Sequence, residues 1–464
     1  MSLPSTSRLA LAVLLTLSLA PAAVAEGPKV TWGLEARLRA EAFDALHRPG
    51  RESDYDLLTA RLRANLDIAW TRWKLHGMVQ GAAADGIPEN ADFGLGTVYF
   101  AANRDDAAEQ LTVAELNAAY VGEGWQLTLG RQGWSDGVET MTGVKYLDGV
   151  KRRRLGERLI GNLDWPLGRR FDGAGFALDQ PAFHLSAFGL RPTSGAVDYD
   201  AFEQLDEVTV YGATLTGKYG QWLPKGEGRF FAYGDQDDRP SALTAAGGEL
   251  DLQTLGSSLL VGNDRADLLA WVAFQQGDWG RVDHQALAFL VEAGANIPVG
   301  ALSLGLRGGV AYASGDDAPG TGDHETFFNM LPTNHKYYGS ADYVAFANLR
   351  EVFVEAQLAP AKGRGTRLAV PRFERAEEAD AWYVGSGAVN DRVFGFNAVP
   401  ISSGAGRSLG TEVDVDVWFA LPANLRLDLY SAFFWGGDSA DARFGAPGGR
   451  SDGSWVSVQL TWKR

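Results

Sequence analysis

Residues 32–41 read WGLEARLRAE. Apolar side chains stand at every second position from Trp32 to Ala40, and charged side chains fill the positions between them from Glu35 to Glu41. Successive side chains of a β-strand point to opposite faces, so this stretch predicts a strand with one apolar face and one charged face. The apolar face suits lipid and the charged face suits water.

The same unit recurs from Val30 to Arg464 as segments of about ten residues separated by turn-rich breaks, which is the pattern of a transmembrane β-barrel. We expect an all-β fold, an 18-stranded antiparallel transmembrane β-barrel. With both ends of the chain in the periplasm, an even number of strands is required. The expected strands are 30–43, 54–70, 72–83, 110–121, 124–131, 170–178, 181–190, 207–218, 227–234, 251–262, 265–277, 284–295, 301–313, 348–359, 365–375, 408–420, 423–435 and 454–463.

The connections between these strands alternate in length, and the strand assignment did not impose this. The even connections are short, for example Thr71, Gly122–Glu123 and Pro422, and are expected to be periplasmic turns. The odd connections are mostly long and rich in Gly, Asp and Pro, and are expected to be extracellular loops. The longest are 84–109, 132–169, 314–347 and 376–407. A soluble β-meander gives no reason for this alternation.

The first residues carry the features of a secretory signal. Arg8 precedes an apolar run from Leu9 to Leu19, and Ala23-Val24-Ala25 forms an A-x-A cleavage site. The run is shorter than the roughly twenty residues that a membrane helix needs, which disfavours an anchor. We therefore expect residues 1–25 to be a signal peptide and residues 26–464 to form the barrel in the outer membrane of a Gram-negative bacterium.

Composition excludes several classes of protein. The formal net charge is −16, and it is −17 for residues 26–464 because Arg8 is the only charged residue before them. This acidity argues against nucleic-acid binding. Cysteine is absent, which excludes disulfides and thiol catalysis. The 14 Trp and 14 Tyr suit the aromatic girdles of a barrel, and the length exceeds that of one soluble β-sandwich.

The strand positions that alternate with the lipid-facing residues carry both positive and negative side chains. Such a face suits a water-filled lumen better than a closed apolar core. The expected lumen cations include Arg37, Arg61 and Arg307, and the expected acids include Glu35, Glu292 and Glu355. Leu302, Leu304, Leu306 and Val310 illustrate the lipid-facing parity. Connection 132–169 carries the densest charge in the chain. On charge alone, it is equally consistent with a filter folded into the lumen and with an outer loop that binds lipopolysaccharide phosphates.

Three stretches resemble one family of proteins. They are Gly130-Arg131-Gln132 followed by Glu157-Arg158-Leu159-Ile160-Gly161, Asp164-Trp165 and Arg170-Phe171-Asp172-Gly173; then Phe327-Phe328 followed by Leu331 through Gly339 and by Asp342; and then Leu409-Gly410-Thr411-Glu412-Val413-Asp414. Their identity and order resemble the alginate-export family of outer-membrane porins over most of residues 30–464. The resemblance favours the filter.

The resemblance implies a monomeric barrel with an arginine-lined conduit through which an anionic polysaccharide leaves the cell. The expected conduit residues are Arg37, Arg61, Arg131, Arg158, Arg169, Arg170, Arg307 and Lys336. Arg131 departs from this pattern because it shares parity with Leu127 and Leu129, so it reaches the lumen only if a bulge intervenes. The many lumen acids also count against a polyanionic solute.

Other motifs give weaker signals. Gly133-Trp134-Ser135-Asp136-Gly137 matches G-x-S-x-G, but no βαβ unit surrounds it, so catalysis is not expected. The six His are scattered, and His335 is interpreted as a structural hydrogen-bonding residue. Asp235, Asp237 and Asp238 could bind Ca²⁺, although they lack the full loop pattern and suit a solvated loop better. No other cofactor is expected.

The sequence thus predicts a porin that passes an anionic, alginate-like polysaccharide or a related organic anion by passive diffusion, with loops 132–169 and 314–347 as gates. Its other partners would be outer-membrane lipid and lipopolysaccharide. The alternative within transport is an uptake channel for small sugars or organic anions. Alternatives of another class are an outer-membrane enzyme, such as a lipase, and a structural or adhesive barrel.

Overall fold

The computed structural model describes most of the chain. The predicted signal peptide lies outside the described residues, which are 27–92, 95–165, 167–195, 197–199, 203–239, 247–300, 302–361, 363–385 and 387–464. Apart from residue 301, all eighteen predicted strands lie within the described segments.

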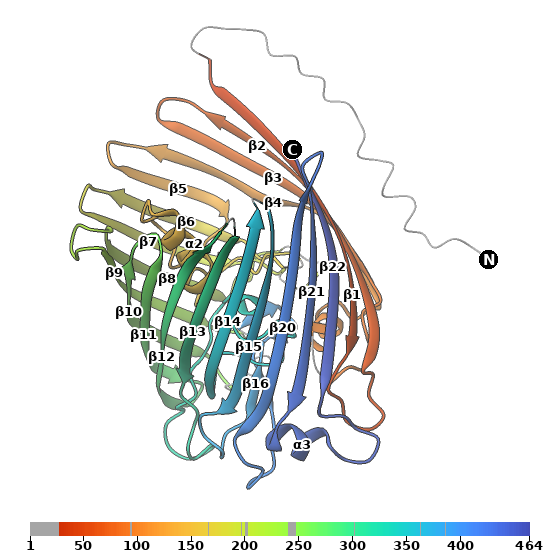
Figure 1. Ribbon diagram of the computed structural model, residues 1–464. Coiled ribbons are helices and arrows are strands. Elements are labelled where there is room, and N and C mark those ends of the chain that lie inside the picture. Colours follow the sequence, from red (N-terminus) through yellow and green to blue (C-terminus); the bar gives the residue numbers. More distant parts are fainter. Residues whose placement is uncertain are drawn as a thin grey trace.

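Eighteen antiparallel strands form one sheet that closes on itself, because β1 pairs with both β2 and β22 (Figure 1). Each predicted strand is present, with ends shifted by a few residues. The strands are β1 (Lys29–Asp44), β2 (Asp54–Ala69), β3 (Trp73–Asp85), β4 (Ala107–Val121), β5 (Trp125–Gln132), β6 (Phe171–Asp179), β7 (Phe183–Pro192), β8 (Val208–Gly217), β9 (Gly226–Asp237), β10 (Leu250–Gly262), β11 (Ala266–Trp279), β12 (Val282–Val299), β13 (Leu302–Ala313), β14 (Leu349–Ala361), β15 (Arg364–Arg375), β20 (Ser408–Leu421), β21 (Leu425–Gly436) and β22 (Gly453–Lys463).

The predicted alternation of short turns and long loops is also confirmed. The C-terminus lies at the end of the barrel where the short turns are, and helix α3 (Asp438–Phe444) lies in a loop at the opposite end (Figure 1). The loops contain further short elements that the sequence did not predict: α1 (Leu95–Asn103), α2 (Lys145–Val150), the π-helix η2 (Lys151–Leu155), the 3-10 helix η3 (Asn334–Lys336), and the strands β16 (Trp382–Val384), β17 (Ala388–Asn390), β18 (Val393–Phe394) and β19 (Asn397–Val399).

The outer wall of the barrel is apolar. Large hydrophobic side chains are exposed on the parity predicted to face lipid, and they include Leu66, Val79, Leu129, Phe230, Leu255, Phe274, Val291, Leu306, Val354, Leu368 and Val458. Trp32, Trp70, Trp73 and Trp222 are exposed near the short turns, where an aromatic girdle is expected. Among the described residues, no helix is both long and apolar enough to cross a membrane.

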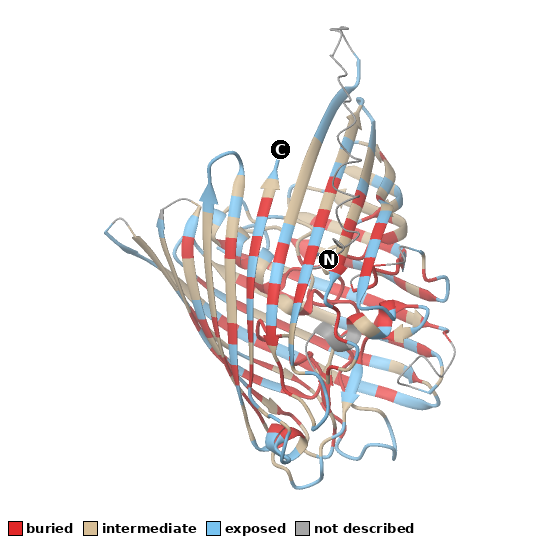
Figure 2. Ribbon diagram, turned by 90° about the vertical axis from the view of Figure 1, so that its right-hand side faces the viewer, coloured by how far each residue is buried: buried red, intermediate tan, exposed pale blue. Residues whose placement is uncertain are grey.

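The inside of the barrel differs between its two ends. Toward the long loops, inward side chains such as Phe43, Leu252, Phe434 and Trp455 are buried and join loop residues in one apolar cluster. Toward the short turns, the inward side chains are polar and half-buried, including Asn65, Asp67, His76, Gln126, Thr128, Asn296, Ser303 and Gln357. Buried positions alternate along the strands (Figure 2). Loops therefore pack the extracellular half, and the periplasmic half is a polar vestibule.

Candidate functional site: the lumen and the loops inside it

The β5–β6 loop, residues 133–170, folds into the barrel. Its side chains form ion pairs with inward residues of strands on different sides of the lumen: Glu227 on β9, Glu292 on β12, Glu355 on β14 and Arg63 on β2. Helix α2, which belongs to this loop, lies within the ring of strands (Figure 1). The loop therefore crosses the lumen, as expected for a filter.

Two buried ion pairs attach this loop to β9: in one the loop supplies the cation, and in the other it supplies the carboxylate. Lys151 Nζ lies 2.5 Å from Glu227 Oε1, with side chains 1% and 2% exposed. Arg229 Nη2 lies 2.6 Å from Glu139 Oε1 and donates a second hydrogen bond, from Nε to Glu139 Oε2, at 3.2 Å. Each charge is desolvated and depends on its partner, so loss of either partner would leave a buried charge uncompensated.

Further contacts attach the loop to β12 and β14. Arg154 donates two hydrogen bonds to the Glu292 carboxylate, at 2.8 and 2.7 Å, and its guanidinium lies 4.5 Å from the centre of the Phe353 ring. Arg153 lies 2.7 Å from Glu355. The predicted conduit residue Arg307 is buried beneath these contacts, 2.6 Å from Asp267 and 3.4 Å from Glu292. It therefore joins a charge cluster that supports the loop.

The β13–β14 loop, residues 314–348, pairs with the β5–β6 loop inside the barrel. Ile160 and Leu331 form a parallel β-bridge. Arg158 donates a hydrogen bond to the Tyr338 hydroxyl at 2.6 Å and lies 4.1 Å from the Tyr337 ring centre. Lys336 Nζ lies 2.6 Å from Glu157 Oε2. The predicted conduit residues Arg158 and Lys336 thus hold the two predicted gates together.

The inner face of β1 and β2 carries the densest group of arginines in the lumen. Arg61 Nη1 lies 3.1 Å from Asp164 Oδ1, and Arg63 lies 2.8 and 2.6 Å from the two oxygens of the same carboxylate. Arg37 donates to the Asp164 carbonyl at 3.2 Å, and Arg39 lies 3.5 Å from the Trp165 ring centre. Desolvation inside the loop-filled lumen opposes the charge of Asp164, although its side chain is 44% exposed, but Arg61 and Arg63 outweigh it and hold its pKa well below the ordinary value.

Arg169 and Arg170 close the end of the loop and are both buried. Arg170 Nε lies 2.7 Å from Glu115 Oε1 on β4. Arg169 is 2% exposed, and the described residues provide no hydrogen-bond partner for its Nε and Nη1 atoms. Burial lowers the pKa of Arg169 to about 10.

Arg131 does not belong to the conduit, which corrects that expectation. The register between β5 and its neighbours runs without a shift from Leu129 to Gln132, so no bulge turns the side chain inward. Arg131 stands beside Leu116, which is 65% exposed on the outer wall, and pairs with Asp172 at 2.7 Å. Its parity with Leu127 and Leu129 places it on the outside of the barrel.

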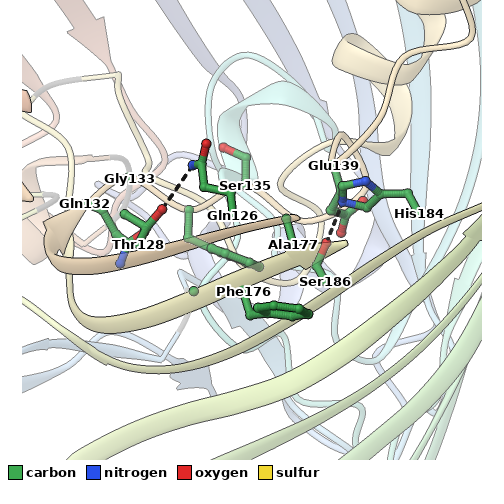
Figure 3. Close-up of a pocket in the computed structure, with 12 residues that line it drawn as sticks. Gln126, Thr128, Gln132, Gly133, Ser135, Glu139, Phe176, Ala177, His184 and Ser186 are labelled. Atoms are coloured by element: carbon green, nitrogen blue, oxygen red, sulfur yellow. Dashed lines mark hydrogen bonds between the residues drawn. The ribbon is translucent and has the colours of Figure 1, made fainter. Parts of the chain in front are cut away.

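A cavity of about 250 Å³, lined by both polar and apolar side chains, lies between the β5–β6 loop and the inner wall of β5 to β7. In Figure 3, Gln126, Thr128 and Gln132 of β5 stand opposite His184 and Ser186 of β7, and Ser135 and Glu139 approach from the loop. Gln126 donates to Thr128 at 3.1 Å, and His184 contacts Ser186 at 3.0 Å. Amide, hydroxyl and imidazole groups of this kind match the hydroxyls of a sugar.

The remaining motifs have structural explanations. Ser135 of the G-x-S-x-G stretch donates to Glu157 at 2.8 Å, and helix α2 begins only at Lys145, so Ser135 does not lie on a sharp strand-to-helix turn. His335 contacts Asp342 at 2.5 Å and stacks on Trp165. Asp237 pairs with Arg239 at 2.6 Å. Within the described segments, the three acids that gather closely enough to hold a cation are instead Asp316, Asp317 and Glu325.

Asp136 gives the loop a pH dependence. Its carboxyl is 1% exposed and accepts hydrogen bonds from the Leu159 and Ile160 N–H groups at 3.2 and 3.1 Å. Burial raises the pKa of Asp136 to about 6. Because the folded-state pKa lies above the unfolded value, the stabilisation is complete at acid pH and is lost as pH rises through 6. The loop should be held more weakly at pH 8 than at pH 5.

Asp136→Asn tests this dependence, because asparagine keeps the acceptor oxygen and does not ionise. We expect the wild-type protein to lose about 1.4 kcal/mol of stability between pH 5 and pH 8 relative to the variant, because the unfolded carboxyl is already mostly ionised at pH 5. Urea unfolding in lipid vesicles at both pH values measures the difference. Parallel pH profiles for the two proteins would show that Asp136 does not titrate in this range.

A family model described as "Alginate export" matches residues 29–453. The chain belongs to the alginate-export family. No curated protein gives a significant sequence match. The alginate-export match includes the β5–β6 and β13–β14 loops, so it covers the features on which the sequence resemblance was based.

Solved structures of outer-membrane proteins share the fold of this alginate-export family member. Pseudomonas aeruginosa OccK9 (OpdG) has a TM-score of 0.55 and 13% identity, with 93% of this chain and 98% of that chain covered. P. aeruginosa OccK2 (OpdF) in complex with glucuronate has a TM-score of 0.54 and 10% identity, covering 94% and 96%. Acinetobacter baumannii OccAB3 has a TM-score of 0.54 and 11% identity, covering 93% and 99%. The family and the fold identify an outer-membrane porin-type transport barrel.

Sequence reasoning missed the β9 anchors of this porin. Glu227 and Arg229 share the inward parity of β9 with Phe231 and Tyr233, which are buried. The parity rule therefore places both charges in the lumen. Their partners, Glu139 and Lys151, lie in a loop without periodicity, so no sequence pattern identified the pairs.

Proposed function

We propose that this porin passes an anionic polysaccharide of the alginate type by passive diffusion. The observation that carries the proposal is the group of inward arginines on β1 and β2, Arg37, Arg39, Arg61 and Arg63, which gather around Asp164 and Trp165 of the loop. Guanidinium groups bind carboxylates through two parallel hydrogen bonds, so such a wall can exchange the hydration of a uronate for direct contacts. Membership of the alginate-export family supports this class of solute.

The lumen acids do not oppose this proposal. Glu227, Glu292 and Glu355 are 2–3% exposed, and each lies within 2.7 Å of a loop cation. Their charge is neutralised by the loop and does not face the vestibule. These three carboxylates are therefore not available to repel an anionic solute in the vestibule.

A second candidate is the uptake of small sugars or sugar acids. The cavity at β5 to β7 favours it, because its hydroxyl and amide groups are neutral hydrogen-bonding partners for a single sugar ring and Trp134 and Phe176 add apolar surface. One of the structural relatives was solved in complex with glucuronate. Both candidates use a polyhydroxylated solute, and they differ in its length.

The arginine wall is tested by replacing Arg37, Arg61 and Arg63 together with glutamine. We expect the anion-over-cation permeability ratio in planar bilayers to fall toward or below one, and block by added uronate oligomers to weaken. Salt should have the same effect as the substitutions, because the field of a wet pore fades over about 8 Å at physiological ionic strength.

A matched control removes the same charge outside the lumen. Arg72, Arg281 and Arg372 are exposed, and their replacement by glutamine should leave selectivity unchanged. If both triple variants kept the wild-type permeability ratio, the arginine wall would lie outside the conduction path. Comparing uronate oligomers with the monomer in the wild-type protein separates polysaccharide passage from small-solute uptake.

A further inference from the structure

The Asp164 side chain occupies its arginine group in the way that a bound ligand would. Arg61, Arg63 and Arg170 surround the carboxylate, with nitrogen-to-oxygen distances of 3.1, 2.6 and 3.8 Å to Oδ1. We call these three residues the cradle. Arg63 makes the strongest of these contacts, because its guanidinium group donates hydrogen bonds to both carboxylate oxygens. Two cradle arginines come from the barrel wall and the third from the end of the loop.

Exposure distinguishes this contact from the ion pairs that attach the loop to β9. The cradle side chains of Arg61, Arg63 and Arg170 are only 5%, 8% and 4% exposed, whereas the Asp164 side chain is 44% exposed. In the pair of Lys151 and Glu227, by contrast, both side chains are at most 2% exposed. The carboxylate of Asp164 thus lies on a floor of buried guanidinium groups and has an open side, where another carboxylate could replace it.

The backbone carbonyls of Trp165 and Leu167 are held by the same wall. The Leu167 carbonyl accepts hydrogen bonds from Arg61 at 3.3 Å and from Arg63 at 2.6 Å. The Trp165 carbonyl accepts one from Arg39 at 2.8 Å. The segment therefore offers the arginines one carboxylate and several neutral oxygens, which are also the groups that a uronate residue offers.

The charge balance favours replacement by an external anion. Arg61 also pairs with Glu35 at 2.6 Å, and Arg170 with Glu115 at 2.7 Å. Within the described part of the chain, Asp164 is the only carboxylate at ion-pair distance from Arg63. Removal of Asp164 would leave the buried Arg63 guanidinium without a carboxylate, a state that a bound anion would relieve.

We infer that the cradle is a carboxylate-binding site for a uronate unit of the solute, and that Asp164 is an internal ligand that competes for it. This rests on the proposed function, which supplies the solute. Entry of a uronate carboxylate displaces Asp164 and frees segment 164–167 from the β1–β2 wall. The loop thus responds to the charged solute that it filters.

The test uses purified full-length protein in planar bilayers, with galacturonate as the probe and galactose as its uncharged counterpart. Asp164→Asn should lower the half-blocking concentration of galacturonate about fivefold, because the internal competitor loses its charge. Galactose should be unaffected. Arg63→Gln should raise the galacturonate value, and Asp391→Asn, which removes one exposed extracellular charge, should leave it unchanged.

An unchanged half-blocking concentration of galacturonate in the Asp164→Asn variant would overturn the inference. An equal fall for galacturonate and galactose would also overturn it, because Asp164 would then only narrow the pore. Hydrogen exchange of residues 163–168 in detergent gives a readout without transport, and galacturonate should accelerate it in the wild-type protein. A wild type that passed no uronate but showed this acceleration would reject the proposed function and retain the carboxylate site.

Discussion

Replacing Lys151 with methionine should destabilise the attachment of the β5–β6 loop by about 3–5 kcal/mol. Lys151 and Glu227 are 1% and 2% exposed and lie 2.5 Å apart. Without the ammonium group, Glu227 is a buried carboxylate whose remaining contact is a long hydrogen bond, 3.4 Å, from Thr140. This unfavourable burial of the Glu227 carboxylate ends when the loop detaches from β9, because water from the vestibule then hydrates Glu227. The open fraction in single-channel recordings should therefore rise strongly.

Two companion variants make this result specific. Lys145→Met changes the same residue type in the same loop at an exposed position, and should leave the open fraction unchanged. The double variant Lys151→Met with Glu227→Leu removes both charges and should recover most of the closed state, because an apolar pair of similar volume replaces a buried ion pair at little cost. If the single variant behaved like Lys145→Met, the loop would not depend on this anchor.

The sequence predicted the barrel because its strands are specified locally. Each strand carries its own alternation of lipid-facing and lumen-facing residues, and turn residues mark its ends, so every one of the eighteen strands was found. Even the segment with Pro371 forms a strand, where pairing to β20 is interrupted between Ala369 and Arg372. Proline lacks the N–H group that the ladder needs. The short strands β16 to β19 have two or three residues each, too few for a periodic signal.

The candidate site could be predicted only in part, because parity gives the face of a residue and not its partner. Arg37, Arg61 and Arg307 were placed correctly on the inner wall. The ion pair between Arg63 and Asp164 joins residues 101 positions apart, and the pair between Arg154 and Glu292 joins residues 138 apart. Such contacts depend on how a loop without periodicity folds across the lumen. Arg131 shows the reverse case, since its parity was a better guide than its motif.

An arginine at position 354 should destabilise the barrel by about 2–4 kcal/mol, because Val354 faces the middle of the lipid band. Val354 is 61% exposed and lies between outward Gly308 on β13 and Val370 on β15. In the membrane those surroundings are hydrocarbon, and a guanidinium there loses its hydration. Urea unfolding of the protein folded into lipid vesicles measures the loss.

Ser303→Arg provides the matched control on the neighbouring strand. Ser303 has the inward parity of β13, is half-buried, and lines a cavity of about 530 Å³ beneath helix α2, so an arginine there finds water and space. We expect a change within about 0.5 kcal/mol, as for a surface substitution away from special contacts. Both variants add one positive charge to the barrel wall, Val354→Arg on its lipid-facing side and Ser303→Arg on its lumen-facing side. Equal destabilisation would mean that the two faces of the wall meet the same environment, which the alternation of exposed apolar and inward polar side chains argues against.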